Sequence, residues 1–299
     1  MSMSKKIALV LSGGGARGLA HVGVIRELEE RGYTITSIAG TSMGSIIGGV
    51  YASGKMDEFE EWIKTLDRMK VLNLLDFAFW DAGLIKADKV IKTMKEFIDD
   101  QNIEDLDLPF CAVAVDLLNR KEVVFRTGSM YDAMRASIAI PSVITPVKYK
   151  DTFLVDGGVM NNIPSVHVAR TEDDLLLAVN VNARVPYDAI EEEPKKSELN
   201  ENYEKQLKEF QSWIDNLIPQ RQKEESLSYF QLARKTISLM TSHIAQLRLE
   251  DSPPDILVEI SRDSAETFDF FKAEELIDYG RREAAKALDK REVQSQSQG

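Results

Sequence analysis

A serine flanked by glycines lies early in the chain, in a setting that suits a nucleophile. Residues 40–44 read Gly-Thr-Ser-Met-Gly, so Ser42 has a glycine two positions to either side. In a sharp strand-to-helix turn these two places leave no room for a side chain, and the turn exposes the hydroxyl. Apolar segments at 34–40 and 43–54 predict that strand and that helix. Ser42 is therefore predicted to be a nucleophile, with a glycine turn that merely permits close packing as the alternative.

A serine hydroxyl needs a base, and histidine is the usual one. The chain has 3 His in 299 residues, namely His21, His167 and His243. None of them directly follows a predicted strand, where a catalytic histidine would be well placed, and each lies in a segment that reads as helical. We therefore expect all three to be structural or surface residues.

An aspartate at the end of another predicted strand is a second candidate base. Residues 152–158 read Thr-Phe-Leu-Val-Asp-Gly-Gly, so Asp156 closes a strand and precedes two glycines. A carboxylate there can take a proton if it is partly removed from water, because desolvation raises its pKa above the reference value near 4. Asp-Gly is also a common turn dipeptide. The local sequence leaves these two interpretations equally open.

A glycine-rich loop precedes the serine motif and could bind an anion. Residues 13–18 read Gly-Gly-Gly-Ala-Arg-Gly, after a predicted strand at 5–12 and at the start of a predicted helix at 16–32. A dinucleotide site would also need an acidic residue near the end of the second strand, and residues 37–42 contain none. An oxyanion hole is the better interpretation, because glycines allow backbone N–H groups to approach a developing negative charge.

Together these motifs resemble those of the patatin-like phospholipase family. The glycine loop, the serine motif and Asp-Gly-Gly occur in that order, and residues 135–141, Arg-Ala-Ser-Ile-Ala-Ile-Pro, are similar to a further family segment. The resemblance covers about residues 5–183. It implies a three-layer α/β/α sandwich, a serine–aspartate dyad without a catalytic histidine, and hydrolysis of lipid acyl esters. It implies no metal and no cofactor.

The resemblance also assigns roles to particular residues. By this analogy Ser42 is the nucleophile, Asp156 is its base, and the backbone N–H groups of Gly13, Gly14 and Gly15 hold the oxyanion. The residues that support these motifs are Arg17, Gly18, Gly40, Gly44, Gly157 and Gly158.

The segments that carry the motifs alternate between strand and helix patterns. Such alternation indicates an α/β fold with a mostly parallel central sheet that is covered by helices on both faces. Further strands are predicted at 110–118, 121–127, 174–181 and 251–260, and further helices at 57–66, 87–99, 130–140 and 273–288. We predict one catalytic domain over residues 1–291, with its core at about 5–183 and 255–290, and a disordered tail at 292–299.

Residues 184–251 form a helical excursion from this pattern. Apolar residues recur there at spacings of three and four, which predicts long amphipathic helices. They are Tyr203, Leu207, Phe210, Ile214 and Leu217, followed by Phe230, Ala233, Ile237, Met240, Ile244 and Leu247. The helices could form a lid, a homodimer contact, a lipid-touching surface or a layer on the protein's own core.

Composition limits the partners and the location. The net charge of −12 argues against nucleic acid and against electrostatic docking on anionic membranes. The single cysteine, Cys111, lies in an apolar run and is expected to be a buried thiol. No signal peptide is apparent, and no segment approaches the ~20 apolar residues of a membrane span. We expect a cytoplasmic protein whose contact with membranes, if any, is peripheral and apolar.

The predicted activity is hydrolysis of phospholipid or lysophospholipid acyl esters through an acyl-enzyme. Two alternatives stay open. Acyl transfer to an acceptor other than water uses the same dyad, and a non-catalytic lipid-binding module would keep the loop geometry.

Overall fold

A central sheet of eight strands organises the computed structural model, which describes residues 5–75, 85–188 and 229–296. The strands are β1 (Lys6–Leu11), β2 (Thr34–Thr41), β3 (Phe110–Asp116), β4 (Lys121–Phe125), β5 (Val147–Tyr149), β6 (Thr152–Asp156), β7 (Leu175–Ala183) and β8 (Ile256–Ser261). Their order is β5-β6-β3-β2-β1-β7-β8, with β4 also paired to β3. Strands β3, β2, β1, β7 and β8 run parallel, whereas β4, β5 and β6 pair antiparallel. The mixed α/β fold and the mostly parallel sheet are confirmed.

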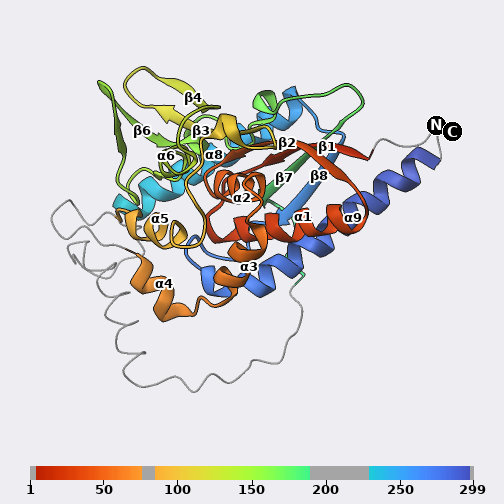
Figure 1. Ribbon diagram of the computed structural model, residues 1–299, viewed down its shortest axis with the longest axis horizontal. Helices are drawn as coiled ribbons and strands as arrows, with labels where there is room; N and C mark the ends of the chain where they lie inside the picture. The colour runs from red at the N-terminus through yellow and green to blue at the C-terminus, as the bar shows by residue number, and fades with distance from the viewer. Residues whose placement is uncertain (1–4, 76–84, 189–228, 297–299) are drawn as a thin grey trace.

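Helices flank this sheet (Figure 1). They are α1 (Ala20–Glu30), α2 (Met43–Ala52), α3 (Met56–Lys64), α4 (Arg68–Leu74), α5 (Asp88–Met94), α6 (Met130–Ser137), α8 (Tyr229–Asp251) and α9 (Ala273–Gln296). The helix predicted at 16–32 is divided into a 3₁₀ turn, Gly15–Leu19, and α1. The helix predicted at 130–140 ends at Ser137, ahead of Pro141 as expected.

The two faces of the sheet carry side chains of different size. Ile7, Leu9 and Leu11 point from β1 into a large core shared with α1, α2 and α9. The alternate residues of β1, Ala8 and Val10, belong to a smaller cluster. Since successive side chains of a strand point to opposite faces, the helical layers on the two sides are of unequal thickness.

Helix α8 covers the smaller face, and part of its predicted apolar stripe is exposed. Met240 and Leu247 are 58% and 50% exposed. Ala245 is the residue of α8 that is buried against the sheet. The sheet residues of this cluster include Ala8, Ala39 and Ala178, whose small side chains let the helix pack closely through an alanine. The earlier stripe, at 203–217, lies outside the described residues.

The C-terminal helix is longer than predicted. Helix α9 continues to Gln296, so residues 292–296 of the expected disordered tail are helical. Ala284 and Leu288 bury its apolar side in the main core. Once a helix is anchored in this way, each added residue gains a backbone hydrogen bond without a new nucleation cost, which explains the extension.

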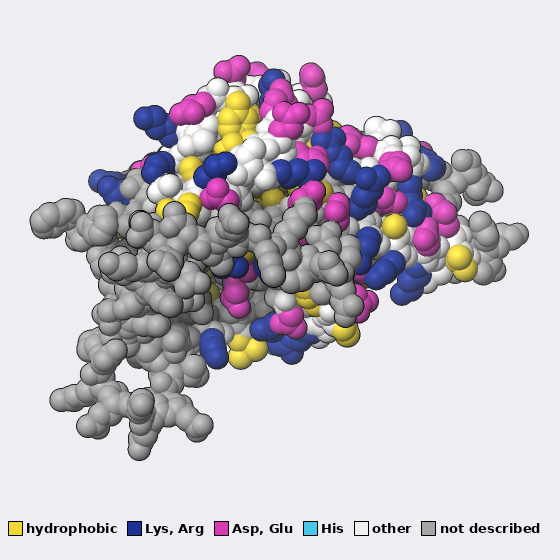
Figure 2. Space-filling view, turned by 90° about the horizontal axis from the view of Figure 1, so that it is seen from below, with side chains coloured by type: hydrophobic (Ala, Val, Ile, Leu, Met, Phe, Trp, Pro, Cys, Tyr) yellow, Lys and Arg dark blue, Asp and Glu magenta, His cyan; other side chains and the backbone are white. Residues whose placement is uncertain are grey.

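Charge on the surface is mixed. On the face shown in Figure 2, Lys and Arg side chains alternate with Asp and Glu, and no basic region is separated from the acidic one. In the described part of the chain no helix has the length and apolarity to cross a membrane.

Candidate active site

Ser42 occupies the turn between β2 and α2, in a backbone conformation that non-glycine residues rarely adopt. Its φ and ψ are 54° and −125°. The two flanking glycines are required by contact, because a Cβ on Gly40 would meet the carbonyl of Gly44, and one on Gly44 would meet the carbonyl of Leu11. The turn therefore has the close-packed geometry that its glycine spacing predicts.

Ser137 holds this turn from the end of α6. The Ser42 N–H donates to the Ser137 hydroxyl at 2.8 Å, and that hydroxyl donates to the carbonyl of Val113 at 2.6 Å. Ser137 is fully buried. It lies within the motif at 135–141, but nothing in its sequence context indicated which atom it would bind.

The register of the sheet brings Asp156 to Ser42. Thr41 pairs with Val113 of β3, and the next residue of β3, Ala114, pairs with Asp156 of β6. Asp156 therefore lies across one strand from the residue that precedes the serine. The antiparallel direction of β6 was not predicted, although the position of Asp156 at its end was.

The Asp156 carboxylate is buried and interacts with two donors. The N–H of Gly158 donates to Oδ1 at 2.7 Å, and the Ser42 side chain lies close enough to the carboxylate to favour its ionised form. Removal from water raises the pKa of Asp156 from 3.8 to about 6, although the Ser42 side chain and the Gly158 N–H act in the opposite direction. A carboxylate with this pKa is ionised near pH 7 yet is a much better proton acceptor than an exposed aspartate.

The glycine loop lies directly against the serine. A Cβ on Gly13 would come within 2.9 Å of the Ser42 Cβ. The Gly13 N–H donates to the carbonyl of Asn162 at 3.2 Å, and the Gly13 carbonyl accepts from the Asn182 side chain at 2.6 Å. Within the described residues, the N–H groups of Gly14 and Gly15 have no hydrogen-bond acceptor. These two are the donors that the loop leaves available.

Arg17 anchors the glycine loop to neighbouring elements of the sheet. Its Nε donates to the carbonyl of Val181 at 3.0 Å, Nη1 to the carbonyl of Ala265 at 2.9 Å, and Nη2 to Asn182 Oδ1 at 2.8 Å. Burial lowers its pKa below the usual arginine range, but a guanidinium stays protonated in proteins. These three neutral acceptors lie in β7 and in the segment after β8, so Arg17 ties the glycine loop to both.

The histidines are occupied elsewhere or exposed. His21 is fully buried and donates from Nε2 to the carbonyl of Ser12 at 2.8 Å; burial lowers its pKa to about 4, so it is neutral. His167 bonds to Glu122 at 2.5 Å, and His243 is exposed. Among the described residues, no hydrogen bond joins any of the three to Ser42.

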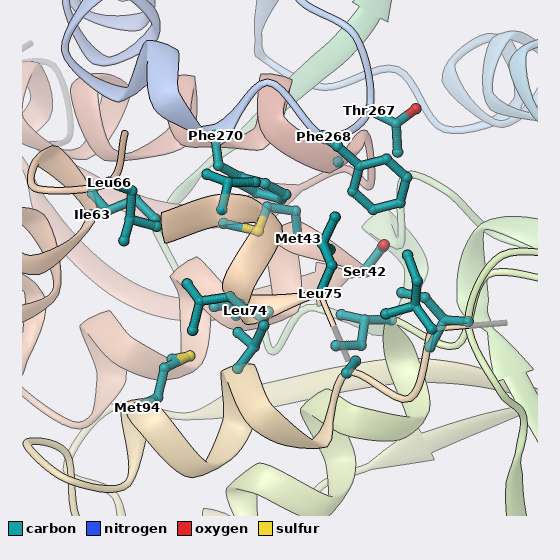
Figure 3. Close-up of a pocket in the computed structure, with 18 of the residues that line it drawn as sticks. Ser42, Met43, Ile63, Leu66, Leu74, Leu75, Met94, Thr267, Phe268 and Phe270 are labelled. Carbon is teal, nitrogen blue, oxygen red and sulfur yellow. The ribbon is translucent and has the colours of Figure 1, made fainter. Parts of the chain in front are cut away.

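Two cavities meet at Ser42. One lies between α2, α3, α4 and α5, and its walls are almost entirely apolar (Figure 3). The other is lined by Asp156, the glycine loop and α8, with polar groups that include Asn162, Ser238 and Thr241. Ser42 and Phe268 line both. A hydroxyl in this position can face an ester whose hydrocarbon and polar parts lie on opposite sides.

Neither the lone cysteine nor the acidic residues form a further chemical centre that the structure describes. Cys111 is buried as expected, and burial raises the pKa of its thiol to about 11. In residues 5–75, 85–188 and 229–296, no three His, Cys, Asp or Glu side chains gather as metal ligands would.

Comparison with known proteins places this geometry in a family. The family model for patatin-like phospholipase matches residues 9–168. An uncharacterized NTE family protein of Mycobacterium tuberculosis (strain H37Rv) is 34% identical over 98% of this chain and 94% of that protein. The chain belongs to the patatin-like phospholipase family, and membership implies lipid acyl hydrolase activity.

Two further proteins match at lower identity. The mouse patatin-like phospholipase domain-containing protein 6 is 32% identical over 60% of this chain, which corresponds to 14% of that protein. The crystal structure of VipD from Legionella pneumophila matches 97% of this chain and 67% of its own, with 14% identity and a TM-score of 0.48.

Proposed function

We propose that this protein hydrolyses the acyl ester bonds of phospholipids or lysophospholipids with a Ser42–Asp156 dyad. The observation that carries the proposal is the placement of Ser42 beside a buried Asp156 carboxylate, by the register of β2, β3 and β6, where an apolar cavity and a mixed cavity meet. The family membership supports the reaction class, and the site geometry supports the residues.

In the first half of the reaction, Asp156 takes the proton of Ser42 as the serine oxygen attacks the ester carbonyl. The negative charge that develops on the carbonyl oxygen is stabilised by the N–H groups of Gly14 and Gly15, at the start of a 3₁₀ turn. Gly13 has a different role from the one expected, because its N–H already donates to Asn162. Its lack of a side chain lets the loop approach the serine.

Collapse of the intermediate breaks the ester bond. Asp156 returns the proton to the departing alcohol, and the acyl group stays on the serine oxygen. Asp156 then takes a proton from a water molecule, which attacks the acyl carbonyl. The fatty acid leaves and the serine recovers its proton. An acceptor alcohol in place of water would give acyl transfer by the same steps.

The two cavities suggest how the substrate lies. We assign the acyl tail to the apolar cavity and the alcohol part to the mixed cavity. Hydrocarbon gains free energy by leaving water for an apolar wall, and a polar head group keeps hydrogen-bond partners among the polar residues of the other cavity.

Helix α8 also offers a surface for the lipid aggregate itself. Ser238 and Thr241 line the mixed cavity, while Leu239, Met240 and Leu247 of the same helix are at least half exposed. An apolar surface next to the mouth of a lipid site suits peripheral contact with a lipid surface. A second copy of this chain is the other occupant that the experiment below distinguishes.

A fluorophosphonate probe tests the dyad. Wild-type protein should gain one probe mass on Ser42, found by peptide mass spectrometry. Ser42→Ala should gain none, and Asp156→Asn should react at least about a hundredfold more slowly, since proton transfer contributes about 10²–10⁴-fold. Labelling of Ser42→Ala at the wild-type rate would exclude Ser42. Product analysis by thin-layer chromatography, with and without an added alcohol, separates hydrolysis from acyl transfer, and an unlabelled wild type would favour the non-catalytic module.

A further inference from the structure

The apolar cavity has a distinct inner wall. In Figure 3, Ser42 lies on one side of the cavity, and Ile63, Leu66 and Met94 lie on the other. Met94 is 1% exposed, and Ile63 is 3% exposed. The lining carries polar side-chain atoms only at Ser42, Thr267 and the Trp62 indole. An acyl chain with its carbonyl at Ser42 would therefore extend through hydrocarbon surroundings toward α3 and α5.

Such a cavity should discriminate between ester substrates by the length of their acyl chains. Each methylene that leaves water for the cavity should raise kcat/KM by about fourfold. The gain ends where the tail meets the wall, because forcing extra methylenes into a packed core costs more than they gain. The chain-length profile should therefore rise to a maximum and fall beyond it, and the residue at the wall should fix the maximum.

We propose that Met94 is this residue, a specificity-determining side chain that limits the length of the unbranched acyl chain. The inference rests on the proposed function. Met94 is the last residue of α5, and its carbonyl accepts from the N–H groups of Phe97 and Ile98 at 3.2 and 2.9 Å, so its backbone is held firmly. Its side chain is long, unbranched and fully buried, and its removal would lengthen the cavity without leaving a polar group unpaired.

Further apolar side chains lie behind this wall. Trp62, which lines the cavity, packs against Phe97 with ring centroids 5.4 Å apart, and Phe97 itself lies outside the lining. Space opened at Met94 would therefore be bounded by aromatic and aliphatic groups, which receive methylene groups well. A bulkier side chain at 94 would shorten the cavity from the same end.

The chain offers a matched control. Met134 of α6 is also a fully buried methionine, but it lines neither cavity. Its terminal methyl group faces Gly49 of α2. Met134→Ala removes the same atoms from the core as Met94→Ala and should lower the melting temperature comparably, without altering the length of the acyl cavity.

The test measures kcat/KM of the full chain on p-nitrophenyl esters from four to sixteen carbons. Met94→Ala should move the maximum to a longer ester by at least two methylenes, and should raise kcat/KM about tenfold or more on the first ester beyond the wild-type maximum. Met94→Phe should move the maximum to a shorter ester. Met134→Ala should leave it unchanged. Alkyl fluorophosphonates of the same lengths should show the same order of labelling rates.

The opposite results separate the two proposals. An active wild type whose maximum stays in place in both Met94 variants, or moves equally in Met134→Ala, overturns the role of Met94 and leaves the hydrolase intact. If Met94→Ala does not fold, the shifts of the maximum in Met94→Val and Met94→Phe test the role of Met94 instead. A wild type that hydrolyses none of the esters and takes up no probe overturns the proposed function, and this inference with it.

Discussion

The backbone N–H of Ser42 is bound by the side chain of Ser137, with 2.8 Å between nitrogen and oxygen. The contact joins the candidate nucleophile to the C-terminal end of α6, a helix that begins 88 positions later in the chain, at Met130. Asp156 is tied to the same segment, because its N–H donates to the carbonyl of Ala139 at 2.9 Å. Residues 137–139 thus position both members of the proposed dyad.

Ser137→Ala should impair catalysis without weakening substrate binding. The Ser42 N–H would lose its buried acceptor, which costs about 1–3 kcal/mol of stability, and the turn would shift. A displacement of the nucleophile by even a fraction of an ångström should lower kcat about ten- to a hundredfold, with KM changed less than threefold. Steady-state kinetics on a short-chain ester give both constants. Ser137→Thr keeps a hydroxyl and should restore most of kcat; if KM rises while kcat stays, Ser137 does not position the serine.

The strained backbone of Ser42 gives a second prediction, on stability. Ser42→Ala and Ser42→Gly should both lack activity, but glycine adopts the observed φ of 54° and ψ of −125° far more readily. Relief of the strain is worth about 1–3 kcal/mol, and glycine's extra entropy in the unfolded chain removes about 0.5–1 of it. Ser42→Gly should therefore unfold at a higher denaturant concentration than Ser42→Ala. A lower midpoint for Ser42→Gly than for Ser42→Ala would mean that the turn stores no strain, because only the entropy cost of glycine would then remain.

The pH dependence of activity should report on Asp156. The group must be ionised to accept the proton of Ser42, so kcat/KM should fall as pH drops through about 6, the pKa to which burial raises it. The measurement is a pH–rate profile between pH 4 and 9 on a neutral ester. An acid limb centred near 4 would show that the Asp156 carboxylate is not desolvated during the reaction.

The same raised pKa makes Asp156 a cost to stability above pH 6. The folded state binds this proton more tightly than the unfolded state, so the free energy of unfolding falls as pH rises from about 4 to about 6. Asp156→Asn should therefore be more stable than wild type at pH 8, by about 1–3 kcal/mol, and no more stable at pH 4. Denaturant unfolding at the two pH values provides the comparison and serves as the control for the inactive variant.

The sequence predicted the turn that holds Ser42 because its glycines leave no alternative to close packing, and these contacts are local. Asp156 could be located at a strand end for the same reason. The antiparallel direction of β6 could not be predicted, because it depends on pairing with β3, about 40 residues earlier in the chain. Ser137 and Asn162 act through a few hydrogen bonds to backbone atoms, which leave no pattern in residue types. What covers the apolar stripe of α8 could not be predicted, because periodicity identifies an apolar face but not its partner.

The histidines should be dispensable for the chemistry. His21→Gln would replace a buried neutral ring that holds the Ser12 carbonyl, so it should lower the melting temperature, yet retain kcat within about tenfold of wild type at a temperature where it is folded. His167→Gln and His243→Gln should retain more. The same ester assay serves for all three. Loss of activity in a folded histidine variant as complete as that of Ser42→Ala would support a histidine-dependent triad instead.

Contact with lipid aggregates should depend on the exposed side of α8. Met240 is 58% exposed on α8, next to Thr241, which lines the mixed cavity. Transfer of its side chain from water to a lipid surface would gain up to about 1.5–3 kcal/mol. Met240→Glu should therefore lower hydrolysis of lipid in vesicles by about tenfold and leave a soluble short-chain ester unaffected. Leu118→Glu, at an equally exposed leucine in the β3–β4 turn that lines neither cavity, is the control and should change neither rate. Size-exclusion chromatography distinguishes the other occupant, since loss of a dimer in Met240→Glu would assign this surface to a second copy of the chain. Equal losses on both substrates, with a lower melting temperature, would place Met240 in the fold rather than at a lipid contact.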